Sequence, residues 1–253
     1  MEDPKVSVIL PCHNSAKTLP RCLDSVVFQT HQNWEIMAVD DVSSDSTAAH
    51  LATYERRDPR IHALRNRRNK GAGVARNLAI LRSSGEYIAF IDSDDAWVFC
   101  KLQLQLSAMR RSDAQFSFTA YKVKSPGRSG YRYAKDIESE GQILRKCTIG
   151  CSTVLHRRQE PPILMDRIKR RQDFCYWVKL IRAGLRPRYM STPLSLYHIG
   201  ATSLSSSKLK SAVYQWIAYR RFIGASRGMS LFYMASYIAL NLRQRVLERI
   251  FWH

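Results

Sequence analysis

Three carboxylates gather where an apolar segment of the chain ends. Residues 87–91 read Tyr-Ile-Ala-Phe-Ile, a pattern typical of a strand buried on both faces, and Asp92, Asp94 and Asp95 follow, with Ser93 between the first two. Like charges this close repel unless something positive lies among them. The segment is therefore either a solvated turn that caps the next helix or part of a site for a divalent cation.

The composition is strongly basic. The 253 residues include 40 Lys and Arg against 21 Asp and Glu, a formal net charge of +19. This excess predicts an anionic partner (nucleic acid, an anionic membrane surface or a phosphorylated ligand), although a generally basic surface has the same composition. The six cysteines have no zinc-like spacing, so we expect reduced thiols. The N-terminal residues carry no secretory pattern, and no apolar stretch approaches the roughly 20 residues that span a bilayer.

Strand and helix patterns alternate through the first part of the chain. Strands are predicted at 6–11, 34–41, 61–66 and 87–92, with helices at 18–30, 45–57 and 73–85. This alternation predicts a parallel α/β sheet with right-handed crossovers. Ligands of such sheets lie outside the carboxyl ends of the strands, so residues 11–14, 40–43 and 92–95 are expected to share one rim.

The pattern is looser from residue 101 onward. Strands are predicted at 114–123 and 151–158, a basic, turn-rich loop at 124–135, a helix at 172–184, and two basic helical stretches at 208–224 and 229–252.

Four ordered motifs resemble those of the family 2 glycosyltransferases. They are PCHN at 11–14, VDDVSSD at 39–45, NKGAGVARN at 69–77 and DSDD at 92–95. The resemblance implies the GT-A fold, an α/β class with a Rossmann-like, mostly parallel sheet flanked by helices. It implies a nucleotide-sugar-binding half at residues 1–110 and an acceptor-binding half at 111–204. A basic, amphipathic helical tail at 205–253 lies outside the resemblance.

The resemblance also implies a donor site. Its residues would be Pro11, His13, Asn14, Asp41, Gly71, Arg76, Asp92 and Ser93. Within this set the turn after the first strand borders the nucleotide base, Asp41 reads the base, and Gly71 and Arg76 approach ribose and phosphates. The sequence departs from the family at His13, where Tyr or Phe is commoner, and at Val42, where Gly is usual.

The resemblance implies a metal and a base as well. Asp92 and Asp94 match the Asp-x-Asp motif that holds Mn²⁺ or Mg²⁺ on the donor diphosphate, which would supply the missing positive charge. Asp173 matches the Asp of a Glu-Asp pair that takes the proton of the acceptor hydroxyl, with Gln172 in place of the Glu. Without the resemblance, a helix N-terminal charge stabilised by the helix dipole would be the favoured interpretation of Asp173, and the resemblance of this helix to the family's reverses that order. His198 could reach the diphosphate but is left outside the metal set.

The function implied is an inverting, metal-dependent hexosyltransferase of cell-surface polysaccharide synthesis. The donor would be a nucleotide sugar, most commonly a UDP-sugar in the family, and the acceptor a glycan or polyprenyl-linked glycan. An alternative is a catalytically silent nucleotide-binding or scaffold protein of the same fold, suggested by Val42 and Gln172. Nucleic acid is not expected as a partner, because acids occupy the rim. The tail either binds an anionic membrane, which would place the protein in the cytoplasm or on the cytosolic face of the inner membrane, or packs on the domain.

Overall fold

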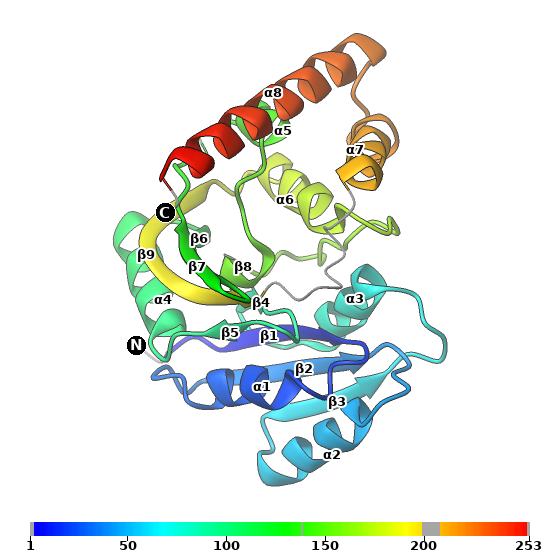
Figure 1. Cartoon of the computed structure of the whole chain (residues 1–253). Coiled ribbons are helices and arrows are strands. Elements are labelled where there is room, and N and C mark those ends of the chain that lie inside the picture. Colours follow the sequence, from blue (N-terminus) through cyan, green and yellow to red (C-terminus); the bar gives the residue numbers. More distant parts are fainter. Residues whose placement is uncertain (1–2, 138, 199–207, 252–253) are drawn as a thin grey trace.

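The structure is a computed structural model that describes residues 3–137, 139–198 and 208–251 (Figure 1). Residues 199–204 of the predicted acceptor-binding half lie outside the described residues, as do residues 205–207 and 252–253 of the predicted tail.

The described strands form one nine-stranded sheet. They are β1 (Val6–Cys12), β2 (Trp34–Asp40), β3 (Ile61–Arg65), β4 (Tyr87–Phe90), β5 (Ala96–Trp97), β6 (Phe116–Ser125), β7 (Arg128–Arg132), β8 (Leu155–Arg157) and β9 (Pro187–His198). The order is β3-β2-β1-β4-β8-β6-β9-β5, and β7 pairs with β6. The sheet is thus continuous across residue 110, where the sequence predicts a division into halves; the division itself stays a prediction.

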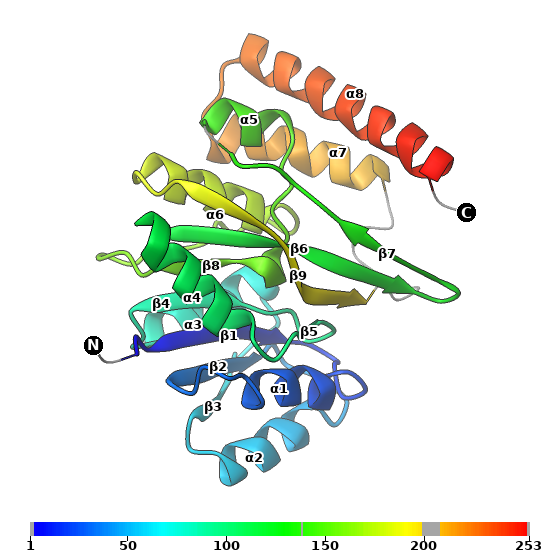
Figure 2. The same cartoon turned by 90° about the vertical axis from the view of Figure 1, so that its left-hand side faces the viewer.

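Helices flank this sheet. They are α1 (Leu19–Val27), α2 (Thr47–Arg57), α3 (Ala72–Arg82), α4 (Lys101–Ser112), α5 (Glu140–Arg145), α6 (Gln172–Arg182), α7 (Lys208–Ile217) and α8 (Arg227–Phe251), with a 3₁₀ turn η1 (Cys151–Thr153) and a π-helical turn η3 (Ala218–Phe222). Figure 2 shows α5, α7 and α8 together at one end of the molecule, with α1 and α2 at the other.

The parallel part of the sheet brings three strand ends to one edge. β1 pairs in parallel with β2, from Val6 opposite Trp34 to Cys12 opposite Asp40, and with β4, whose Phe90 lies opposite Ile9. The segments that follow these strands therefore emerge at the same edge, which confirms the predicted rim.

Two hydrophobic cores cover the two faces of the sheet. In β1, Val8 and Leu10 belong to the core that includes α1, whereas Ile9 belongs to the core that includes α3 and α6. Successive side chains of a strand point to opposite faces, so a strand covered on both sides reads as one continuous apolar run.

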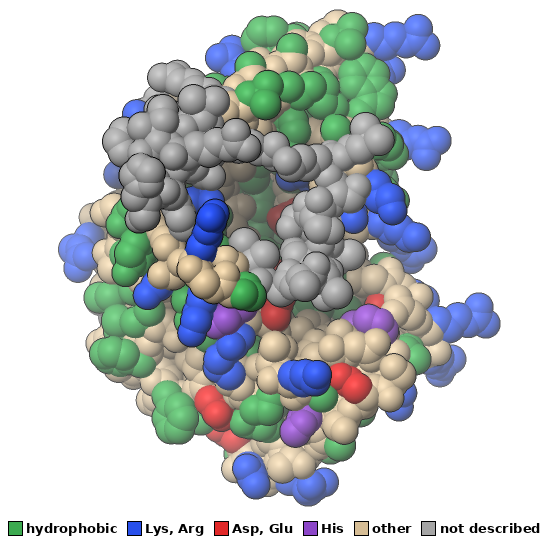
Figure 3. Space-filling model, viewed as in Figure 1, with side chains coloured by type: hydrophobic (Ala, Val, Ile, Leu, Met, Phe, Trp, Pro, Cys, Tyr) green, Lys and Arg blue, Asp and Glu red, His purple; other side chains and the backbone are tan. Residues whose placement is uncertain are grey.

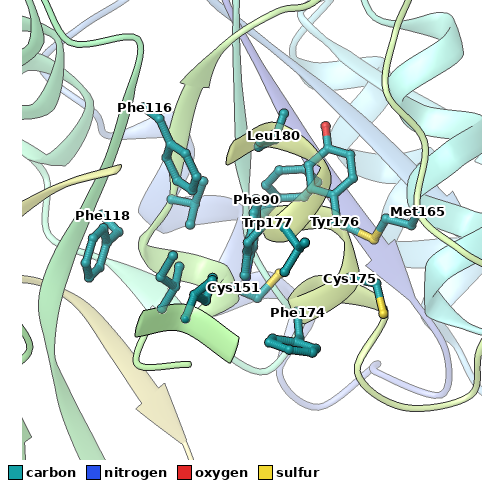
Figure 4. Close-up of a cluster of buried hydrophobic side chains, with 14 of the residues drawn as sticks. Phe90, Phe116, Phe118, Cys151, Met165, Phe174, Cys175, Tyr176, Trp177 and Leu180 are labelled. Carbon is teal, nitrogen blue, oxygen red and sulfur yellow. The ribbon is translucent and has the colours of Figure 1, made fainter. Parts of the chain in front are cut away.

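The packing of α6 fixes the position of its N-terminus. Trp177 is fully buried, and its ring centroid lies 5.5 Å from that of Phe90 and 5.8 Å from that of Phe116. Figure 4 shows these rings together with Phe174 and Tyr176 of the same helix. Asp173 lies in the first turn of α6, so this core decides where its carboxylate is held.

The second half of the chain differs from the predictions in detail. The strand predicted at 151–158 is the turn η1 followed by the short strand β8. The loop predicted at 124–135 contains β7, which forms a hairpin with β6. The patterns also left α4 and most of β9 unassigned.

The tail packs on the domain with one face and exposes the other. Ser230 and Tyr233 of α8 are buried, Tyr233 within the core that contains α6. Leu231, Ile238 and Leu242 remain exposed, at 61%, 47% and 56% of their surface. No described helix has the length and hydrophobicity that crossing a membrane requires.

Candidate active site

Asp41 follows β2 and fixes the loop that leads into α3. Its carboxylate is buried and accepts hydrogen bonds from Asn66 Nδ2 at 2.6 Å and from the backbone N–H groups of Lys70 and Gly71, the latter at 2.7 Å. Gly71 has φ = 84°, a left-handed conformation that suits glycine. The Asp41 carboxylate thus orders the segment predicted to approach the ribose; its contact with the base stays a prediction.

The turn after β1 is joined to the same loop. His13 Nδ1 lies 3.0 Å from the backbone oxygen of Asp41 and 3.3 Å from Asn69 Nδ2. Asn14 has φ = 50°, and its Oδ1 accepts from the backbone N–H of Ser44 at 2.8 Å. The predicted base-side residues therefore form one hydrogen-bonded rim, with Pro11 buried at the end of β1.

Val42 adopts a backbone conformation that its side chain disfavours. Its φ is 64°, in the left-handed region, where a β-branched residue is strained. The family's usual glycine would adopt this conformation without strain, so the loop keeps the backbone that glycine favours despite the substitution.

An ion pair with a buried arginine holds the first acid of the motif. Arg76 of α3 is only 5% exposed, and its Nη2 donates to Asp92 Oδ1 at 2.5 Å. The backbone N–H of Asp92 donates to Ser152 Oγ at 3.0 Å. Ser93 Oγ lies 2.6 Å from Ser15 Oγ, which ties the motif to the turn after β1.

Asp95 is the most deeply buried carboxylate of the cluster. Its Oδ2 accepts from Ser152 Oγ at 2.6 Å and its Oδ1 from the backbone N–H of His198 at 3.3 Å. Burial, with the adjacent Asp92 and Asp94, raises the pKa of Asp95. Burial, helped by Arg21 and Lys124, lowers the pKa of His198, whose Nδ1 has no hydrogen-bond partner among the described residues.

Asp94 is the exposed member of the cluster. Partial desolvation and the neighbouring Asp92 raise the pKa of its carboxyl group, and no described Lys or Arg forms an ion pair with that carboxylate. Arg21 Nη2 instead donates to the Asp94 backbone oxygen at 2.6 Å. A carboxylate that burial and a neighbouring carboxylate make easier to protonate, and that forms no ion pair with the described residues, suits a bound cation.

These donors fit a metal that is shared with a diphosphate. No three described His, Cys, Asp or Glu side chains are grouped to enclose a metal by themselves. Mg²⁺ bound with a nucleotide usually takes only one or two carboxylates and completes its shell with phosphate oxygens and water. Asp94 and the remaining oxygen of Asp92 are carboxylate donors of the number that such an arrangement needs.

Asp173 lies across Arg76 from this acid cluster. Its carboxylate is half-buried in the first turn of α6 and makes neither a hydrogen bond nor an ion pair with the described residues. Its neighbour Gln172 has an amide orientation in which the oxygen accepts from Arg76 Nη1 at 3.2 Å and the nitrogen donates to the Ile168 backbone oxygen at 2.8 Å. Arg76 therefore bridges the helix of Asp173 and the acid of the donor motif.

One face of the molecule has a hollow. Figure 3 shows it between the α/β part below and the helices above, with acidic side chains visible within it. All the predicted site residues lie along this connected rim or at the N-terminus of α6. The sequence argument placed Asp95 in the acidic rim without a role and left His198 outside the metal set. It did not place Ser152 in the site, because no local signal marks that residue.

Solved structures define the class of this fold. TarS of S. aureus in complex with UDP-GlcNAc superposes with a TM-score of 0.72 at 19% identity, over 92% of this chain and 71% of that chain. The mannosyltransferase PcManGT of Pyrobaculum calidifontis, in complex with GDP-Man and Mn²⁺, gives 0.67 at 16% identity, over 93% and 70%. The molecule thus has the GT-A fold of glycosyltransferases, as the sequence predicted.

The chain belongs to glycosyltransferase family 2. The family model, described as glycosyl transferase family 2, matches residues 7–177. The chain is 38% identical over 221 residues to the putative teichuronic acid biosynthesis glycosyltransferase TuaG of Bacillus subtilis, covering 86% of this chain and 88% of the relative. It is 30% identical over 250 residues to the UDP-Glc:α-D-GlcNAc-diphosphoundecaprenol β-1,3-glucosyltransferase WfgD of Escherichia coli, covering 98% of each. The protein is accordingly a glycosyltransferase enzyme.

Proposed function

We propose that this enzyme transfers a sugar, with inversion, from a UDP-sugar to a hydroxyl group of a lipid-linked glycan in cell-surface polysaccharide synthesis. The observation that carries the proposal is the half-buried carboxylate of Asp173, which makes no hydrogen bond or ion pair with the described residues and lies next to Gln172, the residue that contacts Arg76. A carboxylate whose oxygens make no hydrogen bond within the protein can accept the proton of an acceptor hydroxyl.

Inversion follows from a single displacement. The acceptor oxygen attacks the anomeric carbon on the face opposite the diphosphate, the carbon–oxygen bond to the diphosphate breaks, and Asp173 takes the proton of the attacking hydroxyl. The diphosphate leaves with the bonding electron pair. Asp173 has to be positioned rather than strongly basic, because the hydroxyl becomes acidic only as it attacks.

The acid cluster would hold the donor's diphosphate through a divalent metal. Asp94 and Asp92 would be the metal's carboxylate ligands, and bound Mn²⁺ or Mg²⁺ would stabilise the negative charge on the departing diphosphate. The ion pair with Arg76 keeps one oxygen of Asp92 fixed, and the loop ordered by Asp41 would border the base and ribose.

Two relatives support the substrate classes. The WfgD relative is named for UDP-Glc as donor and a diphosphoundecaprenol-linked GlcNAc as acceptor, and the TuaG relative for teichuronic acid biosynthesis. Both names fit a strongly basic protein that handles anionic substrates at a membrane.

The exposed face of α8 fits the membrane that carries such an acceptor. Leu231, Ile238 and Leu242 recur at intervals that place them on one side of the helix, and Phe232 beside them is also exposed. Arg220, Arg221 and Arg227 precede this face or begin it. A helix that is apolar on its free side and flanked by cations suits peripheral binding to anionic lipid.

The test is metal-dependent nucleotide binding in Asp94→Ala. The wild-type protein should show a thermal shift with UDP and Mn²⁺ and should hydrolyse or transfer one of a panel of UDP-sugars. Asp94→Ala should lose both the metal-dependent shift and turnover while its unfolding transition without ligand is preserved, because the residue is exposed. Normal activity of Asp94→Ala at the same Mn²⁺ concentration would refute the metal assignment.

A further inference from the structure

The loop before α6 concentrates positive charge beside the proposed base. Arg167, Lys169, Arg170 and Arg171 fall within five consecutive residues, and Asp173 follows two residues later. Two residues span at most about 7 Å of chain, so Arg171, the last cation of this basic loop (residues 167–171), lies close along the chain to Asp173.

No described carboxylate forms an ion pair with any of these four cations. Elsewhere cations of this half are paired: Lys179 with Asp166 at 2.6 Å, and Arg182 with Glu140 at 2.7 Å. The acid that adjoins the loop, Asp166, is therefore already neutralised by Lys179. Four like charges that repel one another beside an active site fit an anionic ligand that offsets them.

Two of the cations are held in place by the helices of the tail. Arg170 Nη1 donates to Ser211 Oγ of α7 at 3.3 Å. Arg171 Nη2 donates to the hydroxyl of Tyr237 in α8 at 2.5 Å, and its guanidinium lies 5.3 Å from the centroid of that ring. These partners are neutral, so they fix the side chains without removing their charge. Guanidinium groups ordered in this way are suited to phosphate oxygens.

The other two cations are exposed and free to reach a ligand. Arg167 and Lys169 make no side-chain hydrogen bond or ion pair with the described residues. Figure 3 shows Lys and Arg side chains along the edge of the hollow on this side of the molecule.

We propose that the basic loop binds the diphosphate of the acceptor and so presents the acceptor's sugar hydroxyl to Asp173. The proposal rests on the proposed function, because it takes the acceptor to be a sugar carried on a diphosphate. The donor's diphosphate belongs to the separate acid cluster at the ends of β1, β2 and β4, on the other side of Arg76. In such an acceptor, a single sugar ring separates the diphosphate from the hydroxyl that is glycosylated. A diphosphate bound at the basic loop would therefore place that hydroxyl near Asp173, which follows the loop closely in the chain.

The test uses decyl diphosphate, which offers the anion without a sugar, as a probe in titrations with saturating UDP and Mn²⁺. The variant Arg167→Gln/Lys169→Gln removes two charges that make no internal contact, so its fold should be intact. The matched control Arg56→Gln/Arg57→Gln removes two exposed charges from α2, at the opposite end of the molecule. The loop variant should bind decyl diphosphate roughly tenfold more weakly or worse, since each cation contributes about tenfold or less to binding an anionic group. The control should bind it like the wild type.

Three outcomes would overturn the proposal. They are unchanged decyl diphosphate affinity in the loop variant, an equal loss in the control, and a parallel loss of UDP affinity, which would place the loop in the donor site. A second arm uses vesicles of phosphatidylcholine and phosphatidylglycerol without diphosphate lipid. If the loop variant loses binding to these vesicles but keeps binding to decyl diphosphate, the loop recognises headgroups and the proposal is wrong.

Asp173→Asn should bind decyl diphosphate like the wild type although its kcat falls by about 10²–10⁴-fold, which would support the loop as a separate binding site. Normal turnover of Asp173→Asn would instead refute the proposed base, and decyl diphosphate binding would still test the loop. A loss of decyl diphosphate binding in Asp173→Asn would count against that separation.

Discussion

Asp173 and Asp94 differ in exposure and in neighbouring residues, and these differences determine which step of the reaction each substitution should affect. Asp94 is exposed at the end of the sheet among other carboxylates, whereas Asp173 is half-buried on a helix that a large aromatic core positions. Replacing Asp94 therefore removes a ligand for a cation. Replacing Asp173 removes a proton acceptor and leaves the donor side intact.

Asp173→Asn should leave UDP affinity nearly unchanged and reduce kcat by about 10²–10⁴-fold, the usual cost of losing a general base. The amide has the size of the carboxylate, so α6 should keep its packing. The check is a comparison of kcat with the dissociation constant of UDP and Mn²⁺. A collapse of UDP affinity would instead assign Asp173 to the donor site or to the structure.

Val42→Gly should stabilise the protein by about 1 kcal/mol. Release of the left-handed strain of about 1–2 kcal/mol outweighs the cost of glycine's extra freedom in the unfolded chain, about 0.5–1 kcal/mol. Urea unfolding at neutral pH measures the difference. The control Val213→Gly, at an exposed position of helix α7, should destabilise. A destabilised Val42→Gly would mean that contacts of the valine side chain outweigh the strain.

At the scale of elements, a buried carboxylate fastens β2 to the segment before β4. Burial by itself would raise the pKa of Glu35, but donors from Lys5, Ser7 and Ser84 outweigh it and lower this pKa to about 2. Lys5 Nζ lies 2.6 Å from Glu35 Oε2, and Ser7 Oγ donates to Oε1 at 2.6 Å. A lowered carboxylate pKa contributes stability above the unfolded value of 4.5 and loses it as the pH falls toward 2.

Glu35→Gln should therefore lower the free energy of unfolding by roughly 2–3 kcal/mol at pH 7. The gap to the wild type should narrow as the pH falls from about 4.5 toward 2, because the wild-type carboxylate is then protonated too. Glu86→Gln, which breaks only an exposed ion pair with Arg157 at 3.6 Å, should change stability by less than about 1 kcal/mol. If the difference in free energy of unfolding between Glu35→Gln and the wild type did not depend on pH, the lowered pKa of Glu35 would not be the source of this stability.

The sequence predicted the elements whose patterns are local. The mostly apolar segments of β1, β2 and β4 indicated strands, and all three segments are strands with mostly buried residues. Helix α4 was missed because its buried face includes Lys101 and Gln105, which bond to each other at 2.6 Å and so interrupt the apolar stripe. Strand β9 was missed because its pairing with β6 shifts register near Ala120, which breaks a regular alternation.

The residues of the candidate site also fall into two groups: those that a local sequence pattern marks and those that only the fold brings together. Motif residues such as Asp41, Arg76 and Asp92 could be found because each belongs to a short, local motif that resembles one of the family. Ser152, which donates to Asp95 and accepts from the Asp92 backbone, comes from a turn far along the chain. Only the pairing of β8 with β4 brings that turn to the motif, and no local pattern records such a contact.

At the scale of the whole molecule, the tail has two faces with different roles. Deletion of α8 would remove Tyr233 and expose the core against which it packs, so substitution of the exposed face is the sharper test. Leu231→Ser/Ile238→Ser/Leu242→Ser should leave the protein folded and able to bind UDP, while binding to phosphatidylglycerol vesicles falls at least about tenfold. Full burial of one such side chain is worth about 1.5–3 kcal/mol.

The matched control changes three exposed apolar residues away from the tail: Phe28→Ser/Leu81→Ser/Phe99→Ser. Flotation of both variants with vesicles makes the comparison. Equal losses in the two variants, or no loss in either, would show that α8 is not the membrane-binding face. Binding by the wild type should also weaken as salt rises, since the Debye length falls to about 3 Å near 1 M.

The continuity of the sheet limits how substrates can enter and leave. β4 and β5 bracket the acid cluster, and both pair with strands of the second half, β4 with β8 and β5 with β9. A hinge motion that separated the two predicted halves would therefore break backbone hydrogen bonds on both sides of the motif at residues 92–94. Nucleotide exchange must instead proceed by motion of the connecting segments at the rim. In hydrogen–deuterium exchange, the amides of β4 and β8 should remain protected until the whole molecule unfolds, whether or not UDP is bound.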